Sequence, residues 1–148
     1  MKKFILMILA LTLTVMSGYA FDKYSIDRKD LPEAAQQFLS TYFPKAKVGM
    51  IKTDRHLLKK TDFDVKLVNG TKIEFNNSGK WTSIDCKGRE VPADIIPKAI
   101  RKYVAKNFED VKIVRIKKTP SRYEVGLSDD VELNFNHIGQ FKGMKMCD

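Results

Sequence analysis

The stretch Phe63 to Trp81, FDVKLVNGTKIEFNNSGKW, decides the fold, because it recurs sixty positions later as Tyr123 to Phe141, YEVGLSDDVELNFNHIGQF. The matching residues share type and spacing: Phe63, Val65, Leu67, Ile73, Phe75, Asn76, Gly79 and Trp81 align with Tyr123, Val125, Leu127, Leu133, Phe135, Asn136, Gly139 and Phe141. In both copies apolar residues alternate with polar ones over two short runs, which is the period of a half-buried strand. The pattern predicts one structural unit used twice.

Turn residues connect these strands. Asn69-Gly70 between the two runs of the first copy favours a tight type I′ turn, and Asp129-Asp130 takes its place in the second copy. A second turn, closed by Gly79 or Gly139, leads into a third strand. Each copy therefore contains a β-hairpin followed by another strand.

An amphipathic helix is expected before each set of strands. Apolar residues follow helical spacing from Leu31 to Phe43, and again from Ile96 to Phe108. In the first helix we expect Asp30 as the N-cap, Pro32 in the first turn and Pro44 at the end. Stripes this wide need an apolar surface to cover, and the alternating strands provide one.

These patterns predict an α+β fold. Two tandem helix-plus-four-strand repeats, residues 31–91 and 96–148, form one antiparallel sheet of about eight strands with both helices on one face. The residues expected to face the helices are Phe63, Val65, Leu67, Ile73, Phe75, Tyr123, Val125, Leu127, Leu133 and Phe135. The opposite face carries Asp64, Lys66, Lys72, Glu74, Glu124, Glu132 and Asn134, and no helix is left to cover it.

The first twenty residues have the composition of an export signal. Lys2 and Lys3 precede an apolar core too short to span a bilayer, and Gly18-Tyr19-Ala20 resembles a cleavage site. We therefore expect a signal peptide over 1–20, cleaved near Ala20, an N-terminal arm over 21–30 and a single domain over 31–148. The mature chain is expected in the periplasm or outside the cell, without a transmembrane segment.

The chain is basic, with a formal net charge of +9 that becomes +7 once Lys2 and Lys3 are removed. This excess of positive charge favours solubility and attracts acidic partners. A solvated lysine-rich surface is the simpler interpretation. Nucleic acid is excluded as a partner by the expected location.

The loop between Asp54 and Asp62 differs between the copies. The copies align at an offset of 65 residues before it and 60 after it, so the first copy holds five extra residues here. Leu57 and Leu58 at its centre, next to Arg55 and His56, would make an exposed contact point. A longer hairpin without a role is the alternative.

No catalytic or metal-binding constellation is evident. His56 and His137 lack the spacing of metal ligands, and the strand carboxylates alternate outward. We expect no catalytic residues, no metal and no cofactor. Cys86 and Cys147 lie at near-equivalent positions of the two copies, and they either form a disulfide or remain free or intermolecular thiols.

The repeated motif resembles a known family. The pattern L/I-P-x-A, then Y/F-x-V-x-L, then I/L-x-F-N-x-x-G-x-W/F occurs from Leu31 to Trp81 and from Ile96 to Phe141. It is similar to the PepSY-like, β-lactamase-inhibitor-like family of small secreted bacterial proteins. The resemblance covers nearly the whole mature chain and implies the fold described above. The family takes its name from a larger β-lactamase inhibitor protein, which is expected to have two helices per copy, whereas this chain has one evident helix per copy. No motif of this chain matches the residues by which that inhibitor contacts its enzyme.

Our leading functional hypothesis is a secreted, non-enzymatic binding protein that engages another envelope or extracellular protein. Inhibition of an enzyme, a peptidase or a β-lactamase, is one form of such binding. The expected contact residues are Arg55, His56, Leu57, Leu58, Lys66, Lys72, Glu74, Glu124, Glu132 and Asn134. The alternative is an envelope sensor or carrier that binds a small anionic ligand. A closed pocket with convergent Lys or Arg side chains would favour that alternative, and a wide open face would favour a protein partner. A hydrolase would need a buried carboxylate or His in a cleft.

Overall fold

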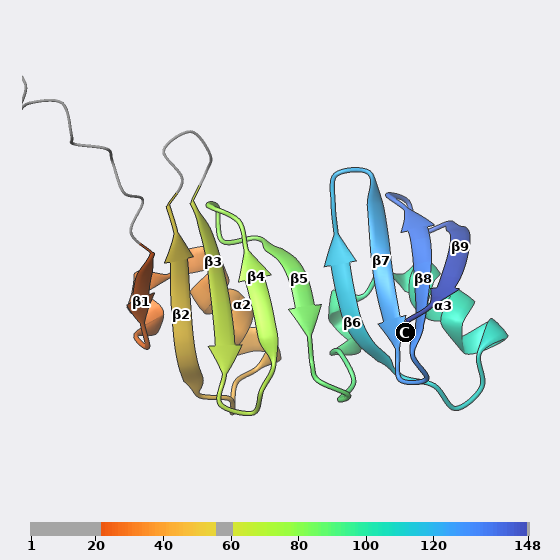
Figure 1. Cartoon of the computed structure of the whole chain (residues 1–148), viewed down its shortest axis with the longest axis horizontal. Helices are drawn as coiled ribbons and strands as arrows, with labels where there is room; N and C mark the ends of the chain where they lie inside the picture. The colour runs from red at the N-terminus through yellow and green to blue at the C-terminus, as the bar shows by residue number, and fades with distance from the viewer. Residues whose placement is uncertain (1–21, 56–60, 148) are drawn as a thin grey trace, which may run out of the picture.

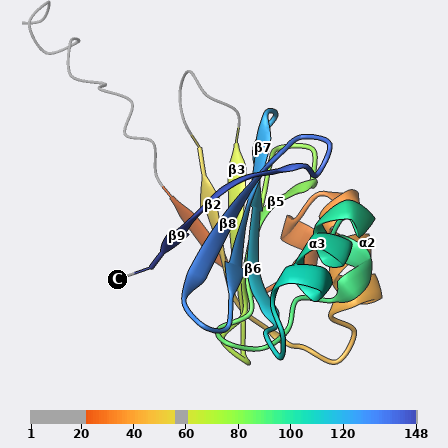
Figure 2. The ribbon, with the colours of Figure 1, turned by 90° about the vertical axis from the view of Figure 1, so that its right-hand side faces the viewer.

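A computed structural model describes residues 22–55 and 61–147, and it shows a two-layer α+β fold. One antiparallel sheet of nine strands, ordered as in the sequence, forms the first layer, and two helices on one of its faces form the second (Figures 1 and 2). The strands are β1 Lys23–Ser25, β2 Val48–Asp54, β3 Asp62–Leu67, β4 Lys72–Phe75, β5 Trp81–Asp85, β6 Ile113–Lys118, β7 Arg122–Leu127, β8 Val131–Asn136 and β9 Phe141–Met146. The helices are α2 Glu33–Tyr42 and α3 Lys98–Asn107, preceded by the short 3₁₀ helices η1 Arg28–Asp30 and η2 Ala93–Ile95.

The strand count exceeds the expected eight because the segment predicted as an N-terminal arm contributes β1. Tyr24 lies opposite Lys52 at the edge of the sheet, and Ser25 lies opposite Ile51. Three residues are too few to show a period of two, so only the backbone pairing with β2 reveals this strand.

The predicted start of the first helix is wrong. Asp30 belongs to η1, which Asp27 caps by accepting a hydrogen bond from the Lys29 amide. Pro32 has an extended backbone, with φ −54° and ψ 147°, so α2 begins only after it. Pro97 has the same conformation before α3. A proline with extended ψ thus stands immediately outside each helix rather than in its first turn.

The core lies between the helices and the sheet. Ala35 and Leu39 of α2, and Ile100 and Val104 of α3, are buried against it. All ten strand residues expected to face the helices belong to this core, with Phe63 and Tyr123 half-buried at its margin. Burial of each large apolar side chain stabilises the fold by about 1.5–3 kcal/mol. The prediction of which sheet face the helices cover is therefore confirmed.

Two glycine turns hold the sheet against the helices. Gly79 has φ +76°, and a Cβ built there would lie 2.8 Å from the Ala35 amide nitrogen of α2. Gly139 has φ +84°, and its Cβ would lie 3.0 Å from the Ala99 Cβ at the start of α3. Only glycine tolerates both the positive φ and the close approach.

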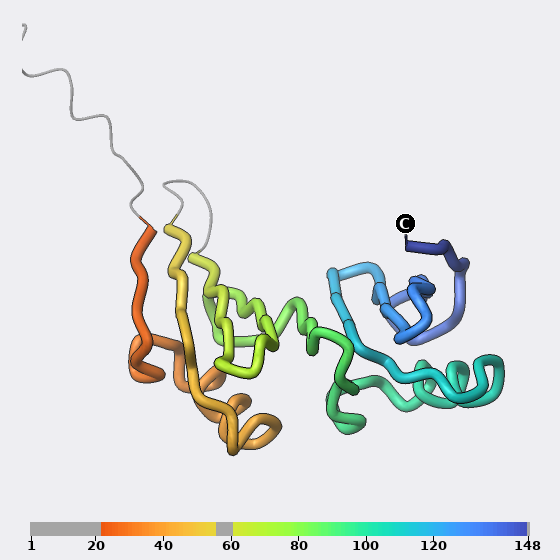
Figure 3. The backbone as a smooth tube through the Cα atoms, turned by 60° about the horizontal axis from the view of Figure 1, so that its bottom comes forward, coloured from red at the N-terminus to blue at the C-terminus, as the bar shows by residue number. Residues whose placement is uncertain are grey.

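The two helices lie under opposite ends of the sheet, with β5 and β6 between them (Figure 3). These central strands pair through Ser83 with Lys117, Ile84 with Ile116, and Asp85 with Arg115. Within the described residues, no helix has the length and apolar character needed to cross a bilayer.

Candidate functional site

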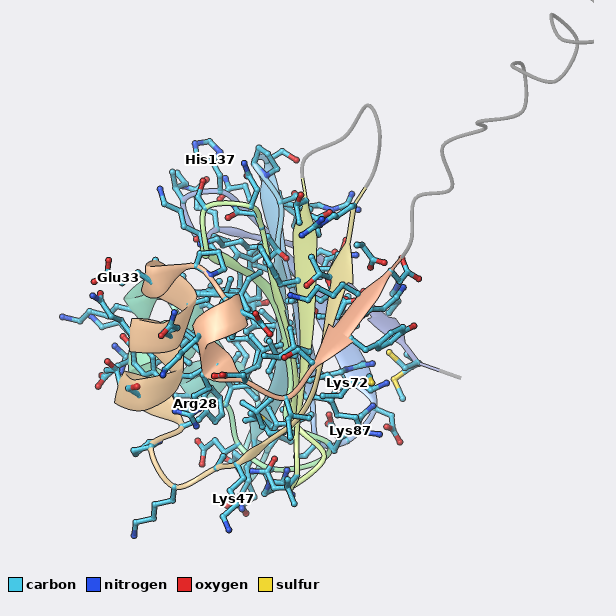
Figure 4. The ribbon with its side chains drawn as sticks, turned by 90° about the vertical axis from the view of Figure 1, so that its left-hand side faces the viewer. Arg28, Glu33, Lys47, Lys72, Lys87 and His137 are labelled. Atoms are coloured by element: carbon cyan, nitrogen blue, oxygen red, sulfur yellow. The ribbon has the colours of Figure 1, made fainter. Side chains whose placement is uncertain are left out.

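The sheet face opposite the helices, called the open face below, is covered by neither of the two helices (Figure 2). Strand pairing assigns to it residues that alternate with the buried ones: Tyr24, Met50, Lys52, Asp54, Asp62, Asp64, Lys66, Lys72, Glu74, Ser83, Asp85, Arg115, Lys117, Arg122, Glu124, Gly126, Glu132, Asn134 and Lys145. Figure 4 shows Lys72 on this side of the sheet and Glu33 on the far side of the helices. The strand residues predicted as contacts, Lys66, Lys72, Glu74, Glu124, Glu132 and Asn134, all lie on the open face.

Cross-strand pairing arranges most of these residues in two rows. One row runs from Lys52 through Asp64, Glu74, Ser83, Lys117 and Glu124 to Asn134. The other runs from Met50 through Lys66, Lys72, Asp85, Arg115, Gly126 and Glu132 to Lys145. Both signs of charge occur in each row, so the open face is not a uniformly basic surface.

On the half of the open face formed by β6–β9, the carboxylates have basic partners. Arg122 and Glu124 form an ion pair of 2.7 Å, and Lys145 and Glu132 form one of 3.0 Å. The hydrogen bond that Lys145 donates to Glu132 raises the pKa of the lysine. The basic side chain of each pair is solvent-exposed, so these pairs contribute little to stability.

On the half formed by β1–β4, the charges are arranged differently. Lys52 is held by Asp54 at 2.7 Å and by Asp22 at 3.3 Å, which raises its pKa. Asp64 lies opposite Glu74, and the pKa of Asp64 is raised by burial and then by the charges of Glu74 and Asp54. Lys52 lies opposite Asp64 and lowers its pKa by a smaller amount, but among the described residues Asp64 forms no ion pair.

Three depressions lie along the open face. The first, of about 290 Å³, is lined by Met50, Lys52, Asp64, Lys66, Lys72 and Glu74. The central one, of about 220 Å³, is lined by Ser83, Asp85, Arg115, Lys117, Glu124 and Glu132. The third, of about 520 Å³, is lined by Arg122, Glu124, Glu132, Asn134, Lys142 and Lys145. A further hollow of about 520 Å³, around Phe43 to Lys47, lies away from this face.

The sequence prediction left out twelve of the residues that strand pairing assigns to the open face: Tyr24, Met50, Lys52, Asp54, Asp62, Ser83, Asp85, Arg115, Lys117, Arg122, Gly126 and Lys145. Met50 and Arg115 directly precede the buried Ile51 and Ile116, so strict alternation along each strand was a signal that would have found them. No pattern pointed to Tyr24. Arg115 lies across Gly126, since a Cβ built on that glycine would be 2.5 Å from the arginine Nε.

The predicted loop contacts are only partly described. Arg55 is exposed at the end of β2. His56, Leu57 and Leu58 lie outside the described residues. His137 is exposed in the turn after β8 (Figure 4). Among residues 22–55 and 61–147, no three His, Cys, Asp or Glu side chains are arranged to hold a metal ion.

The two cysteines are unpaired and lie on different sides of the sheet. Cys86 is buried in the helix-side core, and burial raises the pKa of its thiol. Cys147 is half-exposed, and its sulfur accepts a hydrogen bond from Arg115 Nη2 at 3.5 Å, on the open face. The sheet itself therefore separates the two thiols.

Comparisons with known proteins give a family and several solved structures. The family described as "Putative beta-lactamase-inhibitor-like, PepSY-like" matches residues 61–143. A "putative periplasmic protein of unknown function" from Bacteroides vulgatus is 37% identical, with a TM-score of 0.81 over 84% of this chain and 99% of that one. A "putative calcium-regulated periplasmic protein" from Bacteroides thetaiotaomicron is also 37% identical, with a TM-score of 0.79 over 84% and 96%.

A second periplasmic protein from Bacteroides vulgatus is 38% identical, with a TM-score of 0.80 over 86% of this chain and 99% of that one. None of these descriptions names an enzyme. Among curated proteins, no match to the chain is found.

Proposed function

The chain belongs to the PepSY-like, beta-lactamase-inhibitor-like family, and from that premise we propose that it is an exported, non-enzymatic protein that binds another envelope protein on its open face. Inhibition of a peptidase or a β-lactamase is one form that this binding takes. The family description is the only support for the inhibitory form. The similar solved proteins are described as periplasmic, which supports export after cleavage near Ala20.

The observation that carries the proposal is the uncovered sheet with its mixed charge. Of the residues assigned to the open face, seven are basic and seven are acidic: Lys52, Lys66, Lys72, Arg115, Lys117, Arg122 and Lys145 against Asp54, Asp62, Asp64, Glu74, Asp85, Glu124 and Glu132. Protein interfaces gain specificity from such alternation of charge. Small-ligand sites are instead concave and mostly apolar, with a few convergent polar groups.

The alternative of a small anionic ligand has less support. In each of the three depressions, basic side chains are accompanied by at least two carboxylates. These carboxylates would repel an anion that approached the lysines. The mixed lining therefore favours a partner that carries both signs of charge.

We also propose that the two halves are copies of one unit. In each half a helix is followed by four strands, and a ring of the helix packs edge-on against a buried phenylalanine. Phe38 lies 5.6 Å from Phe75, and Tyr103 lies 5.4 Å from Phe135, between ring centroids. Superposition of residues 31–85 on residues 96–146 tests this, because unrelated halves would not align strand for strand.

Affinity capture from the native envelope tests the proposed function. The mature protein expected after cleavage, residues 21–148, is compared with a variant carrying Lys66→Glu and Lys117→Glu on the open face. A control variant carries Lys98→Glu and Lys102→Glu, which are exposed on α3 and change the net charge equally. We expect the open-face variant to lose at least about tenfold of the captured partner, as charge reversal in an interface can cost several kcal/mol.

The control variant should capture the partner as well as the wild type does. The proposal is wrong if the wild type captures no reproducible partner. It is also wrong if the open-face variant captures as much partner as the control.

A further inference from the structure

The open face of β3 and β4 places like charges directly opposite each other, twice. Asp64 lies opposite Glu74, and Lys66 lies opposite Lys72. Like charges at directly opposed positions destabilise a sheet. Exchanging the two residues of β4 would turn both repulsive pairs into attractive ones without altering composition, although it would place a carboxylate opposite Asp85 of β5.

These four charges have no ion-pair partner within the part of the chain that the structure describes. Lys52 lies opposite Asp64, but Asp54 and Asp22 already hold its ammonium. Asp85 lies opposite Lys72, but Asp85 is already paired with Lys87 at 2.9 Å. On the other half of the open face, Glu124 and Glu132 are both paired. Among the described residues, the open-face carboxylates that lack an ion pair are thus confined to β3 and β4.

The electrostatic environment of Asp64 is consistent with a carboxylate that has no ion pair. Burial, Glu74 and Asp54 together raise its pKa, and the opposing effect of Lys52 is smaller. A cation placed beside Asp64 and Glu74 would relieve their repulsion. An anion beside Lys66 and Lys72 would do the same for the two lysines.

Apolar side chains flank these charges on the same face. Tyr24 is 59% exposed, and Met50 is 37% exposed. Met50 lies opposite Lys66 and contributes to the depression of about 290 Å³ that the four charges line. Exposed aromatic and methionine side chains beside charged groups are typical of protein-binding surfaces. Strands β6–β8 have no exposed large apolar residue among those described on the open face.

We infer that the β1–β4 half of the open face is the docking surface, and that it fits a partner protein segment presenting one cationic and one anionic side chain. The cation binds between Asp64 and Glu74, and the anion binds between Lys66 and Lys72. Tyr24 and Met50 form the apolar margin on which the rest of the partner packs. This inference rests on the proposed function and names the chemistry of the partner.

The spacing of the charges defines the segment further. Asp64 and Lys66 are two residues apart on one strand, and so are Glu74 and Lys72 on the next. Two residues of a strand span about 7 Å. An extended partner segment with opposite charges at positions i and i+2 matches this separation, because both side chains then project from the same face.

A titration with capped peptides tests the inference. The probe is N-acetyl-Lys-Thr-Glu-amide, and the control peptides carry two lysines or two glutamates around the same threonine. Each is added to the ¹⁵N-labelled protein, residues 21–148, at low salt. We expect the dipolar peptide to bind about fivefold more tightly than either control, since it gains two favourable surface ion pairs where they gain one. Amide shifts should centre on β2–β4.

The double exchange Lys72→Glu with Glu74→Lys is the decisive variant. It keeps the composition and the net charge, and it makes both cross-strand pairs attractive. We expect its preference for the dipolar peptide to disappear, because the four charges of β3 and β4 then satisfy one another. The matched control exchanges Glu132→Lys with Lys145→Glu, which reverses an existing ion pair, and it should keep the preference. The single substitution Glu74→Gln should reduce the preference and provides a second measurement if the double variant does not fold.

Equal binding of all three peptides, or of none, would overturn the inference, as would amide shifts centred on β6–β8. So would an unchanged preference in the exchanged variant. Envelope capture separates this failure from failure of the proposed function. If the exchanged variant still captures the partner that the Lys66→Glu, Lys117→Glu variant loses, the open face binds but the docking surface lies elsewhere on it.

Discussion

Asp64, on the open face, makes the folding stability of the protein depend on pH. Its pKa is raised above the usual 3.8 because burial and the neighbouring carboxylates disfavour its charge. A carboxyl with a raised pKa in the folded state stabilises the protein most when protonated, and this contribution is lost as the pH rises through that pKa. The folded protein therefore has to accommodate an unfavourable charge at neutral pH.

Asp64→Asn should consequently stabilise the protein at pH 7, by about 1 kcal/mol or less because the group is largely solvent-screened. The gain should shrink as the pH falls toward the usual pKa of the carboxyl, where Asp64 of the wild type is protonated as well. Urea denaturation at pH 7 and near pH 3.5 measures both values. A gain that does not depend on pH would show that the charge of Asp64 is not its cause.

The cysteines differ in reactivity because of where they lie. Cys147 is half-exposed beside Arg115, whereas Cys86 is 2% exposed and its pKa is raised by burial. We expect one alkylated thiol in the native, non-reduced protein, at Cys147, and a second at Cys86 after denaturation without reductant. Mass spectrometry counts the labels. No label in denaturant would demonstrate a disulfide and contradict the expectation.

Gly79 tests the contact between turn and helix. Gly79→Ala combines strain from the positive φ with a clash against the Ala35 backbone, so it should cost about 2–4 kcal/mol. Gly88→Ala is the matched control, because Gly88 also has a positive φ, +85°, but a Cβ there meets no atom within 4 Å. It should cost about 1 kcal/mol. Urea denaturation measures the free energy of unfolding of both variants. If Gly79→Ala and Gly88→Ala lose the same amount, the positive φ alone explains the need for glycine at position 79, and the contact with α2 adds nothing.

At the scale of elements, α3 packs against the sheet through one edge-on and one stacked ring contact. Tyr103 lies 5.4 Å from Phe135 of β8 and 4.7 Å from Phe141 of β9, between ring centroids. Tyr103→Ala should destabilise the protein by about 3 kcal/mol, whereas Tyr103→Phe keeps the ring and should cost less than about 1 kcal/mol. Thermal unfolding compares the two. Similar losses for both variants would assign the effect to the hydroxyl group.

For the whole molecule, we expect one cooperative unfolding transition. A single core cluster runs from Leu31 and Ala35 in the first half to Leu133 and Phe135 in the second. Trp81, the only tryptophan, belongs to β5 and lies under the ammonium of Lys118 from β6, 4.4 Å from the ring centroid. Its fluorescence therefore reports on the junction between the halves. Fluorescence and far-UV circular dichroism should give coincident urea transitions, and two separate midpoints would show that the halves unfold independently.

The alternation of Val65, Leu67, Ile73 and Phe75 with charged residues determined the hairpins and the sheet face that the helices cover. The apolar stripe that includes Leu39 determined the helix that covers this sheet face. These features were predictable because each depends on the spacing of residues close together along the chain. The residues that alternate with the buried ones were then assigned to the opposite face, and this placed Lys66, Lys72 and Glu74 on the open face.

Other features depend on neighbours that are distant in the sequence. The pairing of β1 with β2 and the start of α2 after Pro32 had no local signal strong enough to reveal them. The same holds for the charges. Local alternation placed Asp64, Lys66, Lys72 and Glu74 on one face, but only the register between β3 and β4 sets like charge opposite like charge. A shift of two residues in that register would leave every side chain on its face and give each charge a different neighbour, so the tertiary structure alone decided which charges remain uncompensated.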